Sequence, residues 1–353
     1  MSWLDEVEAG LGRRATWGAV AAAAVGVLAF VTGLGAGGAP RAFGALIASW
    51  LFLAGAAMGA VTFRAFFRIV DAGWARPLAL LGGGMAGFGP VAWVVLLVIL
   101  AGAGWAPWIP RPTGWLAVPT LAGREAALGA LLFVLAWRWF RLRGAAPSMS
   151  QAVTWCIAFA VVGSVWAFDF VLGPDPIADS TMVGPYVFMA AFTAGTSLVV
   201  LLGLVRGVLG ERERRDAAGL DFALSIFWAY LLCSQFLTSW YANRPEETGY
   251  LLRRSVDGWP WVVWAVVALV WAVPFFGLLH PAGRRSPAVF KGVLVAQLLG
   301  LWLNCHLMVV PSMATPGSAP LGLRDLLILA GMLGAFALAV ARSLRPEPVQ
   351  LRV

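Results

Sequence analysis

The sequence predicts an all-α integral membrane protein with ten transmembrane helices and both termini in the cytoplasm. Of the 353 residues, 61% are apolar and only 12% are charged, which is about half the charged fraction of a soluble globular protein. Apolar runs of about eighteen or more residues, the length that crosses a bilayer, recur along the whole chain. Basic residues gather at alternate ends of these runs.

The ten apolar runs leave no room for a soluble domain. The longest linkers, near 103–123 and 244–259, are rich in Pro and Trp, as is typical of loops at the membrane interface. The predicted spans are 16–34, 43–63, 78–102, 124–140, 150–172, 184–206, 220–243, 260–279, 287–310 and 323–342.

The basic residues indicate orientation. With the N-terminus in the cytoplasm, 18 Lys and Arg lie inside and 7 lie outside, which is the positive-inside pattern. The net charge of +8 is therefore a topology signal, and nucleic acid is not an expected partner. Acidic residues at 5, 6 and 8 exclude a signal peptide. The first residues, through Leu11, are expected to form either a short helix on the inner membrane surface or a frayed tail.

We predict a single polytopic membrane domain over 1–353 with internal organisation. An offset of 136 residues aligns span 2 with span 6 and brings Gly59 onto Gly195, which indicates two four-helix bundles, spans 2–5 and 6–9, flanked by spans 1 and 10. The expected parts are the interfacial segment with span 1 (1–41), the first four-helix bundle (42–172), the second four-helix bundle (184–310) and span 10 (323–342).

Small residues and prolines predict local features of the spans. Gly55 and Gly59 form a G-x-x-x-G spacing that allows another helix to approach closely. Kinks are expected near Pro90 and Pro274, and Pro311 is expected to end span 9.

Spans 5, 7 and 9 carry the few polar side chains of the membrane interior. Lipid offers no hydrogen bonds, so we expect these side chains to turn toward one another. They would form one polar seam in the second bundle that either relays protons or stabilises packing, with Asp169 and His306 close together near the outer surface. The seam residues are Asp169, Tyr230, Gln235, Asn304 and His306.

Other polar residues are assigned simpler roles. Asp175 is expected to be solvated or bound to a partner, and Arg324 is expected to neutralise Asp325. A continuous proton path is not expected, because the inner half of the membrane offers no carboxylate. It offers only Thr193, Thr196, Ser197, Lys291 and Gln297.

Metal and cofactor sites are not expected in this chain. Its three cysteines lie inside predicted spans, and neither a CxxC, a CxxCH nor an iron–sulfur spacing is present. Any redox centres would therefore belong to partner subunits.

The stretch 227–248 resembles the signature of one family, the F subunit (ActF) of alternative complex III, within the wider group of NrfD-like membrane subunits. A weaker resemblance covers Phe168-Asp169-Phe170 through Asp175-Pro176, Ser180-Thr181 and Gly184 to Tyr186. There, Phe170 and Ile177 replace the expected Trp and His, which weakens any outer-surface proton donor at that place. The resembling residues in the first stretch are Trp228, Tyr230, Ser234-Gln235-Phe236, Trp240-Tyr241-Ala242-Asn243 and Pro245-Glu246-Glu247-Thr248.

The resemblance implies a cofactor-free, non-catalytic subunit of a quinol-oxidising respiratory complex in the bacterial inner membrane. Its role would be assembly, with a proton relay as a further function. Menaquinol or ubiquinol would bind at a neighbouring subunit. The implied partners are an NrfD-like quinol-binding subunit, an iron–sulfur subunit, a multihaem cytochrome c and membrane lipid.

Two alternatives stay open. The first alternative is that the chain itself binds quinol, as an NrfD-like anchor. This would require a carboxylate or His pair near the outer face that opens to lipid, and Asp169 with His306 is the candidate pair. The second alternative is a secondary transporter with two repeats. This would require broken helices that form a polar site at mid-membrane, and the helices could break at Pro90 and Pro274.

Overall fold

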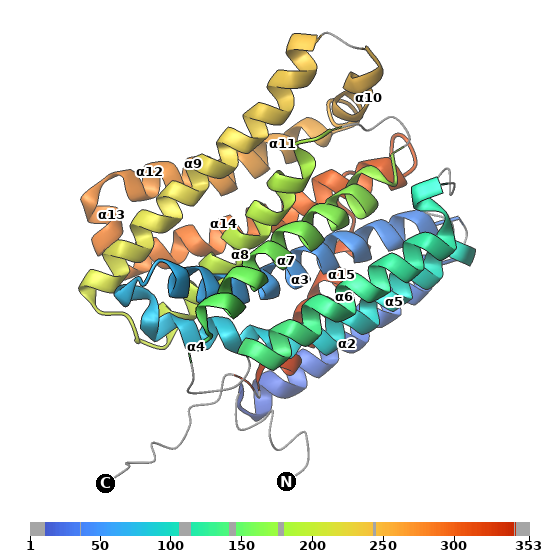
Figure 1. Ribbon diagram of the computed structural model, residues 1–353. Helices are drawn as coiled ribbons and strands as arrows, with labels where there is room; N and C mark the ends of the chain where they lie inside the picture. The colour runs from blue at the N-terminus through green and yellow to red at the C-terminus, as the bar shows by residue number, and fades with distance from the viewer. Residues whose placement is uncertain are drawn as a thin grey trace.

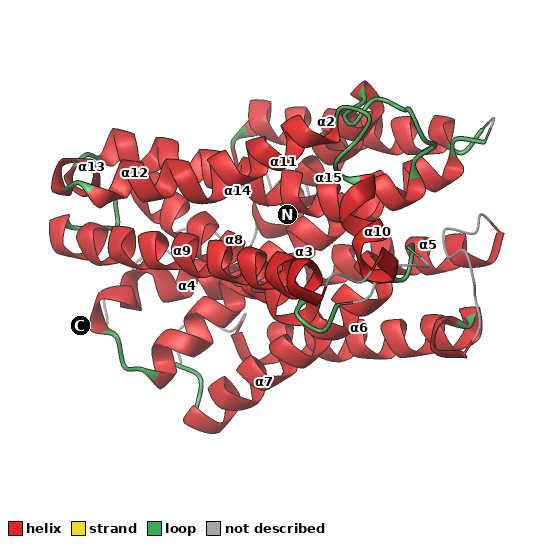
Figure 2. Ribbon diagram, turned by 90° about the horizontal axis from the view of Figure 1, so that it is seen from above, coloured by secondary structure: helices red, strands yellow, loops and turns green. Residues whose placement is uncertain are grey.

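The computed structural model describes residues 11–35, 37–105, 114–140, 146–175, 180–242, 245–341 and 343. All regular structure in this part of the chain is helical (Figure 1, Figure 2). Ten helical segments are long and apolar enough to cross a membrane. The prediction of an all-helical, multi-pass membrane protein is thereby confirmed. The predicted interfacial helix falls on residues outside the described ranges, apart from its last residue.

Seven of the ten spans in the described chain are single helices, and three are composite. The single helices are α2 (Arg13–Gly33), α3 (Ala39–Ile69), α6 (Val118–Phe140), α8 (Val183–Val205), α9 (Glu211–Ala242), α14 (Pro287–Met313) and α15 (Leu323–Ala341). The composite spans join η1 (Gly73–Ala75), α4 (Arg76–Gly84), η2 (Met85–Phe88) and α5 (Gly89–Trp105); α7 (Met149–Trp166) and η4 (Ala167–Leu172); and α11 (Trp259–Val267), η5 (Ala268–Ala272) and α12 (Val273–Leu279). Three short helices lie in connections: η3 (Gly114–Leu116), α10 (Pro245–Arg253) and α13 (Pro281–Arg285).

Helix α3 is the centre of the molecule. Its most apolar stretch is entirely buried, whereas α2 exposes most of its surface. It packs against α8, α14, α7, α4, α5 and α15. Around it, α5 contacts α6 and α6 contacts α7, while on the other side α8 contacts α9, α9 contacts α12, and both α12 and α8 contact α14.

The closest approach between spans is the crossing of α3 and α8. A methyl group on Gly59 would overlap the backbone of Ala191, and one on Gly195 would overlap the backbone of Gly59 and Ala60. The G-x-x-x-G spacing therefore brings two helices together as predicted. The two glycines aligned by the 136-residue offset lie against each other. Gly55 meets Ala191 and Ala60 meets Gly195, so α3 and α8 run in the same direction where they cross.

Two interruptions of the spans lie directly before prolines. The 3₁₀ segment η2 lies just before Pro90, and the π-helix η5 lies just before Pro274. Each proline removes a backbone donor from the helix, which explains why the regular α-helical bonding is interrupted there. Pro311 differs from the expectation. It lies inside α14, which continues to Met313, so the prediction that it ends span 9 is wrong.

Helices α2 and α15 form a pair at the edge of the molecule. Gly26 and Gly331 face each other so closely that neither tolerates a side chain. Asp325, at the start of α15, is buried and pairs with Arg41 at 2.7 Å. The predicted pairing of Asp325 with Arg324 is therefore wrong. The side chain of Arg324 packs against Gly33 instead.

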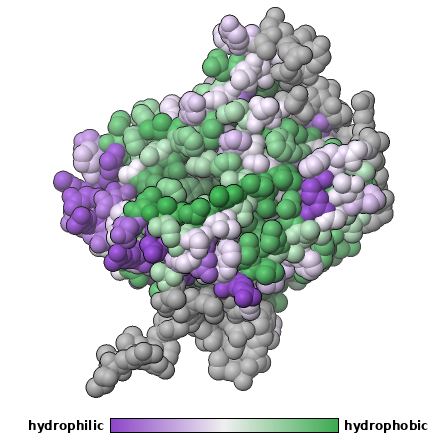
Figure 3. All heavy atoms as spheres, viewed as in Figure 1, coloured by the Kyte–Doolittle hydropathy of each residue, from purple (hydrophilic) through white to green (hydrophobic). Residues whose placement is uncertain are grey.

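The surface follows the same division into membrane and water. Apolar side chains cover the middle of the face seen in Figure 3, and polar side chains gather where α9 begins and α13 lies. Arg212, Arg214 and Arg215 of α9 and Arg284 and Arg285 of α13 lie there. We call it the arginine-rich end, and the other the opposite end.

Candidate functional site

Asp169 lies in the π-helix η4 near the opposite end and is fully buried. Its Oδ2 accepts hydrogen bonds from Nη2 and Nε of Arg124 at 2.6 and 3.1 Å. Its Oδ1 accepts one from Nε1 of Trp115 at 2.7 Å. The Arg124 guanidinium also lies 3.8 Å from the centre of a Trp115 ring. These charge-assisted bonds fix the carboxylate and join span 5 to α6 and η3.

A second carboxyl group, Glu125, lies beside this ion pair, and the sequence analysis missed it. It is fully buried on α6, 3.8 Å from Nε of Arg124. Neither of its oxygens has a hydrogen-bond partner in the described part of the chain. One guanidinium thus faces two carboxyl groups, and it can neutralise only one. We call Trp115, Arg124, Glu125 and Asp169 the Asp169 cluster.

Tyr230 does not face the interior of the molecule as predicted. Its side chain is 61% exposed and stacks on Phe227 at the surface of α9. Gln235 is half-buried on the same helix. The prediction was wrong because the inward-facing aromatic of this stretch is Trp228, whose ring lies 5.9 Å from that of Tyr186.

Asn304 and His306 are buried on α14 but have different partners. Asn304 accepts a 2.6 Å hydrogen bond from the hydroxyl of Tyr186 on α8. The ring of His306 lies 5.9 Å from that of Trp259 and 5.6 Å from that of Trp302, and its Nε2 is 2.9 Å from the carbonyl oxygen of Pro320. His306 thereby holds the segment before α15 against α14.

The five predicted residues therefore do not form one seam. Asp169 is bonded within the first half of the chain, Tyr230 is at the surface, and the contacts of His306 share no residue with those of Asp169. Asn243, from the predicted family-motif loop, lies outside the described residues. Glu246 and Glu247 belong to α10.

Asp175, predicted to be solvated or bound to a partner, is buried within this chain. Its Oδ2 accepts a 3.0 Å hydrogen bond from the hydroxyl of Ser312, and its Oδ1 lies 3.7 Å from Arg253. It differs from the expectation because the segment after η4 lies against the end of α14, where Ser312 follows Pro311. The rest of this predicted loop, 176–179, lies outside the described residues. It includes Ile177, which stands where the resembling family has a His.

Arg254 replaces the backbone donor that Pro311 lacks. In an uninterrupted helix the N–H of residue 311 would bond to the carbonyl of Leu307. Here Nε of Arg254 donates to that carbonyl at 2.9 Å, and its Nη2 donates to the carbonyl of Met308 at 2.6 Å. The hydroxyl of Tyr250 donates to the carbonyl of Met308 as well, at 3.1 Å.

Burial changes the pKa values of Arg254 and Tyr250. It lowers the pKa of Arg254 and raises the pKa of Tyr250 from their ordinary values. Four hydrogen bonds and a Tyr250 ring centred 3.4 Å from the guanidinium offset the cost of burying the charge of Arg254. The contact therefore ties α10 and the residue after it to the broken turn of α14.

A third buried group lies in the half of the membrane near the arginine-rich end. The hydroxyl of Ser197 on α8 lies 3.1 Å from Oδ1 of Asp221 on α9 and 2.6 Å from Oε1 of Gln297 on α14. It also lies 2.9 Å from the carbonyl of Thr193. All three side chains are fully buried. The expectation that this half holds no carboxylate is therefore wrong, and we call Ser197, Asp221 and Gln297 the Ser197 cluster.

The hydrogen atoms of the Ser197 cluster can be counted. A serine hydroxyl has one hydrogen, but three acceptors surround it. Gln297 supplies a second hydrogen if its amide is turned so that the nitrogen faces Ser197. A third hydrogen, on the carboxyl group of Asp221, would make all three contacts ordinary two-centre hydrogen bonds. The arrangement can thus hold a proton on a carboxyl group that three helices surround.

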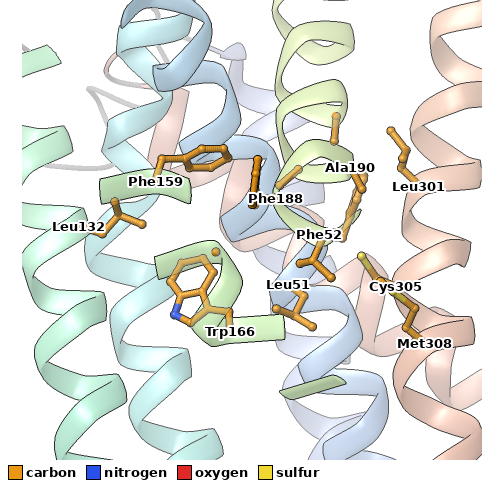
Figure 4. Close-up of a pocket in the computed structure, with 15 residues that line it drawn as sticks. Leu51, Phe52, Leu132, Phe159, Trp166, Phe188, Ala190, Leu301, Cys305 and Met308 are labelled. Carbon is orange, nitrogen blue, oxygen red and sulfur yellow. The ribbon is translucent and has the colours of Figure 1, made fainter. Parts of the chain in front are cut away.

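An apolar cavity lies between α3, α7, α8 and α14 (Figure 4). Phe52, Phe159, Trp166 and Phe188 are among its lining residues. Its volume of about 20 Å³ has room for about one water molecule. This cavity is therefore too small for the ring of a quinol.

The described residues contain no group of three or more His, Cys, Asp or Glu side chains placed to hold a metal ion. The three cysteines are unpaired, with Cys305 buried on α14 and Cys233 exposed on α9. No protein-family model matches the chain, and no curated protein matches it either.

Proposed function

We propose that this chain is a cofactor-free membrane subunit of a quinol-oxidising respiratory complex, similar to the F subunit of alternative complex III. In this proposal both termini are cytoplasmic in a bacterial inner membrane, and spans 2–5 and 6–9 form two four-helix bundles. Helix contacts around α3 and α8 support the bundles. The haem c and iron–sulfur clusters belong to partner subunits, since three cysteines are fewer than the four thiolates of an ordinary iron–sulfur cluster.

The main support for this proposal is a stripe of side chains on the exposed face of α9. The stripe consists of Phe227, Tyr230, Ser234, Leu237 and Tyr241, whose spacing of three and four residues places them on one face of the helix. Tyr230 is 61% and Tyr241 is 85% exposed, and no described residue bonds to the Tyr230 hydroxyl. A hydroxyl within a span needs a partner that lipid does not provide. A helix of another subunit would provide it, and the stripe lies in the stretch that resembles the family.

Native purification tests the proposal as a whole. Membranes of the source organism, solubilised in mild detergent, should yield this chain in a stable assembly. The assembly should show a c-type haem spectrum and contain iron. A colourless chain that purifies alone would contradict the proposal and favour a transporter.

Tyr230→Ala should weaken the attachment of this chain to its partners. We expect the haem that copurifies per chain to fall by about tenfold, because buried interface tyrosines are frequent hot spots. Tyr230→Phe, which removes only the hydroxyl, should cost about threefold. Trp264→Ala on α11 is the matched control, since Trp264 is 71% exposed outside the stripe. Equal losses in the Trp264 and Tyr230 variants would show that the stripe has no special role.

A proton relay is the second function that we propose, at the Ser197 cluster. Its support is the hydrogen count, which a proton on Asp221 would complete. The Oδ2 atom of Asp221 has no partner among the described residues, so this oxygen is open to a further donor or acceptor. Tyr186 and Asn304 extend the polar groups toward the opposite end on α8 and α14.

Asp221→Asn should remove the relay without unfolding the chain. Asparagine has nearly the same shape but cannot release a proton. In liposomes that contain the complex, we expect quinol-driven proton uptake from the cytoplasmic side to slow by about 100-fold. Asp216→Asn, an exposed position on the same helix, is the control. Unchanged uptake in the Asp221 variant would refute the relay while leaving the subunit assignment intact.

A further inference from the structure

A second, larger cavity opens at the arginine-rich end. It lies where α3 ends and α4 begins, and Ala146 and Pro147 also line it. Its volume is about 560 Å³, within the range of about 300–1,000 Å³ that is typical of sites for small molecules. It is therefore large enough for a ligand, unlike the apolar cavity at the crossing of α3 and α8.

Three arginines line this cavity, with a single carboxylate: Arg64, Arg68, Arg76 and Asp71. Arg64 is buried, and its Nη1 donates to the carbonyl of Phe140, the last residue of α6. Arg68 donates through Nε to the carbonyl of Pro147 at 3.2 Å, and no described residue accepts a bond from its two terminal nitrogens. We call this the arginine cavity.

Asp71 offsets only part of the positive charge. It lies 3.4 Å from Arg76, and both side chains are more than three-quarters exposed, so this contact is weak. Among the described residues that line the cavity, three guanidinium groups face one carboxylate, so this lining is positively charged. An anionic ligand would therefore be favoured.

The cavity also has an apolar side. Phe67, Ala79 and Leu80 line it, and Leu80 is exposed to the surroundings of the molecule, as are Phe66 and Val70 nearby on α3. A ligand that fits both sides has an anionic head and an apolar body. Phospholipids have this form, and a basic pocket between spanning helices on the cytoplasmic side is a typical site for their head groups.

We propose that the arginine cavity binds the phosphate group of an anionic phospholipid, with Arg68 and Arg76 as the ligating side chains and Arg64 fixed behind them. The acyl chains would lie along Phe66, Val70 and Leu80. This site depends on the chain spanning a membrane, and it does not depend on the proposed role in quinol oxidation. The two can therefore fail separately.

Native mass spectrometry of the purified full-length chain tests the site. The probes are phosphatidylglycerol, zwitterionic phosphatidylcholine and inorganic phosphate. We expect phosphatidylglycerol to bind most tightly, and Arg68→Gln with Arg76→Gln to weaken it about 25-fold, or about fivefold per arginine near a membrane surface. Arg285→Gln, which removes an exposed charge from α13 outside the cavity, should change the affinity by less than about twofold.

Each other result would overturn the proposal. Equal binding of inorganic phosphate and phosphatidylglycerol would identify a site for a soluble anion rather than a lipid. Equal binding of phosphatidylcholine would show that the head-group charge is not recognised. An equal loss in the Arg285 variant would show general charge attraction without a site. Circular dichroism of each variant confirms that it is folded before binding is compared.

Discussion

Arg254→Ala should lower the free energy of unfolding by about 3 kcal/mol, and Pro311→Ala should recover part of that loss. The alanine at 254 leaves the carbonyl of Leu307 without a donor, because Nε of Arg254 is its partner at 2.9 Å and Pro311 has no N–H. An alanine at 311 returns the missing backbone donor. The two changes should therefore not be additive.

A double-mutant cycle in detergent measures this coupling. Chemical unfolding of the wild type, both single variants and the double variant should give a coupling of about 1 kcal/mol or more. Arg254→Lys is the control for charge. A lysine keeps the positive charge but cannot reach the carbonyls of Leu307 and Met308 with a planar fork, so it should remain destabilised. Additive single effects would show that Arg254 does not replace the donor of Pro311.

The number and type of helices could be predicted from the sequence because lipid imposes a simple rule. Every backbone group of a span must be bonded within its own helix, so apolar length alone identifies the spans. The close crossing at Gly59 could be predicted for a similar reason, since only small residues allow two helices to touch. The fate of Pro311 could not. Its helix continues because a side chain 57 positions earlier in the chain, Arg254, supplies the missing bond.

The positions of the polar side chains could be predicted only in part. A buried polar group needs a partner, but the sequence does not say which one. Asp169 meets Arg124 and Trp115 rather than His306. Asp221 was missed although the predicted span 220–243 contains it, because a carboxylate next to the end of a span is normally solvated. Its position inside the apolar run is the signal that would have found it.

Glu125 was missed for a different reason. It directly follows Arg124, the first residue of the predicted span 124–140, and so lies at the expected membrane boundary. An Arg-Glu pair at such a boundary is normally solvated. Here η3 and the π-helix η4 cover it, so Glu125 becomes a buried acid without a hydrogen-bond partner in the described chain. Two buried carboxyl groups then share one guanidinium, and an apolar site favours a neutral acid over an unpaired charge.

Asp169→Asn should therefore be tolerated better than the loss of a buried ion pair normally is. Breaking such a pair costs about 3–5 kcal/mol, but Glu125 lies 3.8 Å from Nε of Arg124 and can become its counter-ion by releasing a proton. Glu125→Gln alone should change the free energy of unfolding by less than about 1 kcal/mol. The double variant leaves Arg124 without either carboxylate, and we expect it to incur the full cost of about 3–5 kcal/mol.

Infrared spectroscopy separates this exchange of partners from a merely structural effect. A protonated carboxylic acid has a C=O stretching band that a carboxylate lacks. The band of Glu125 should be present in the wild type and absent from Glu125→Gln. It should also be absent from Asp169→Asn, because there Glu125 is ionised beside Arg124. A band that persists in the Asp169 variant, or single effects that add up to that of the double variant, would show that Glu125 does not replace Asp169. The Asp169 cluster would then be a fixed ion pair with a bystander acid rather than two carboxyl groups sharing one positive charge.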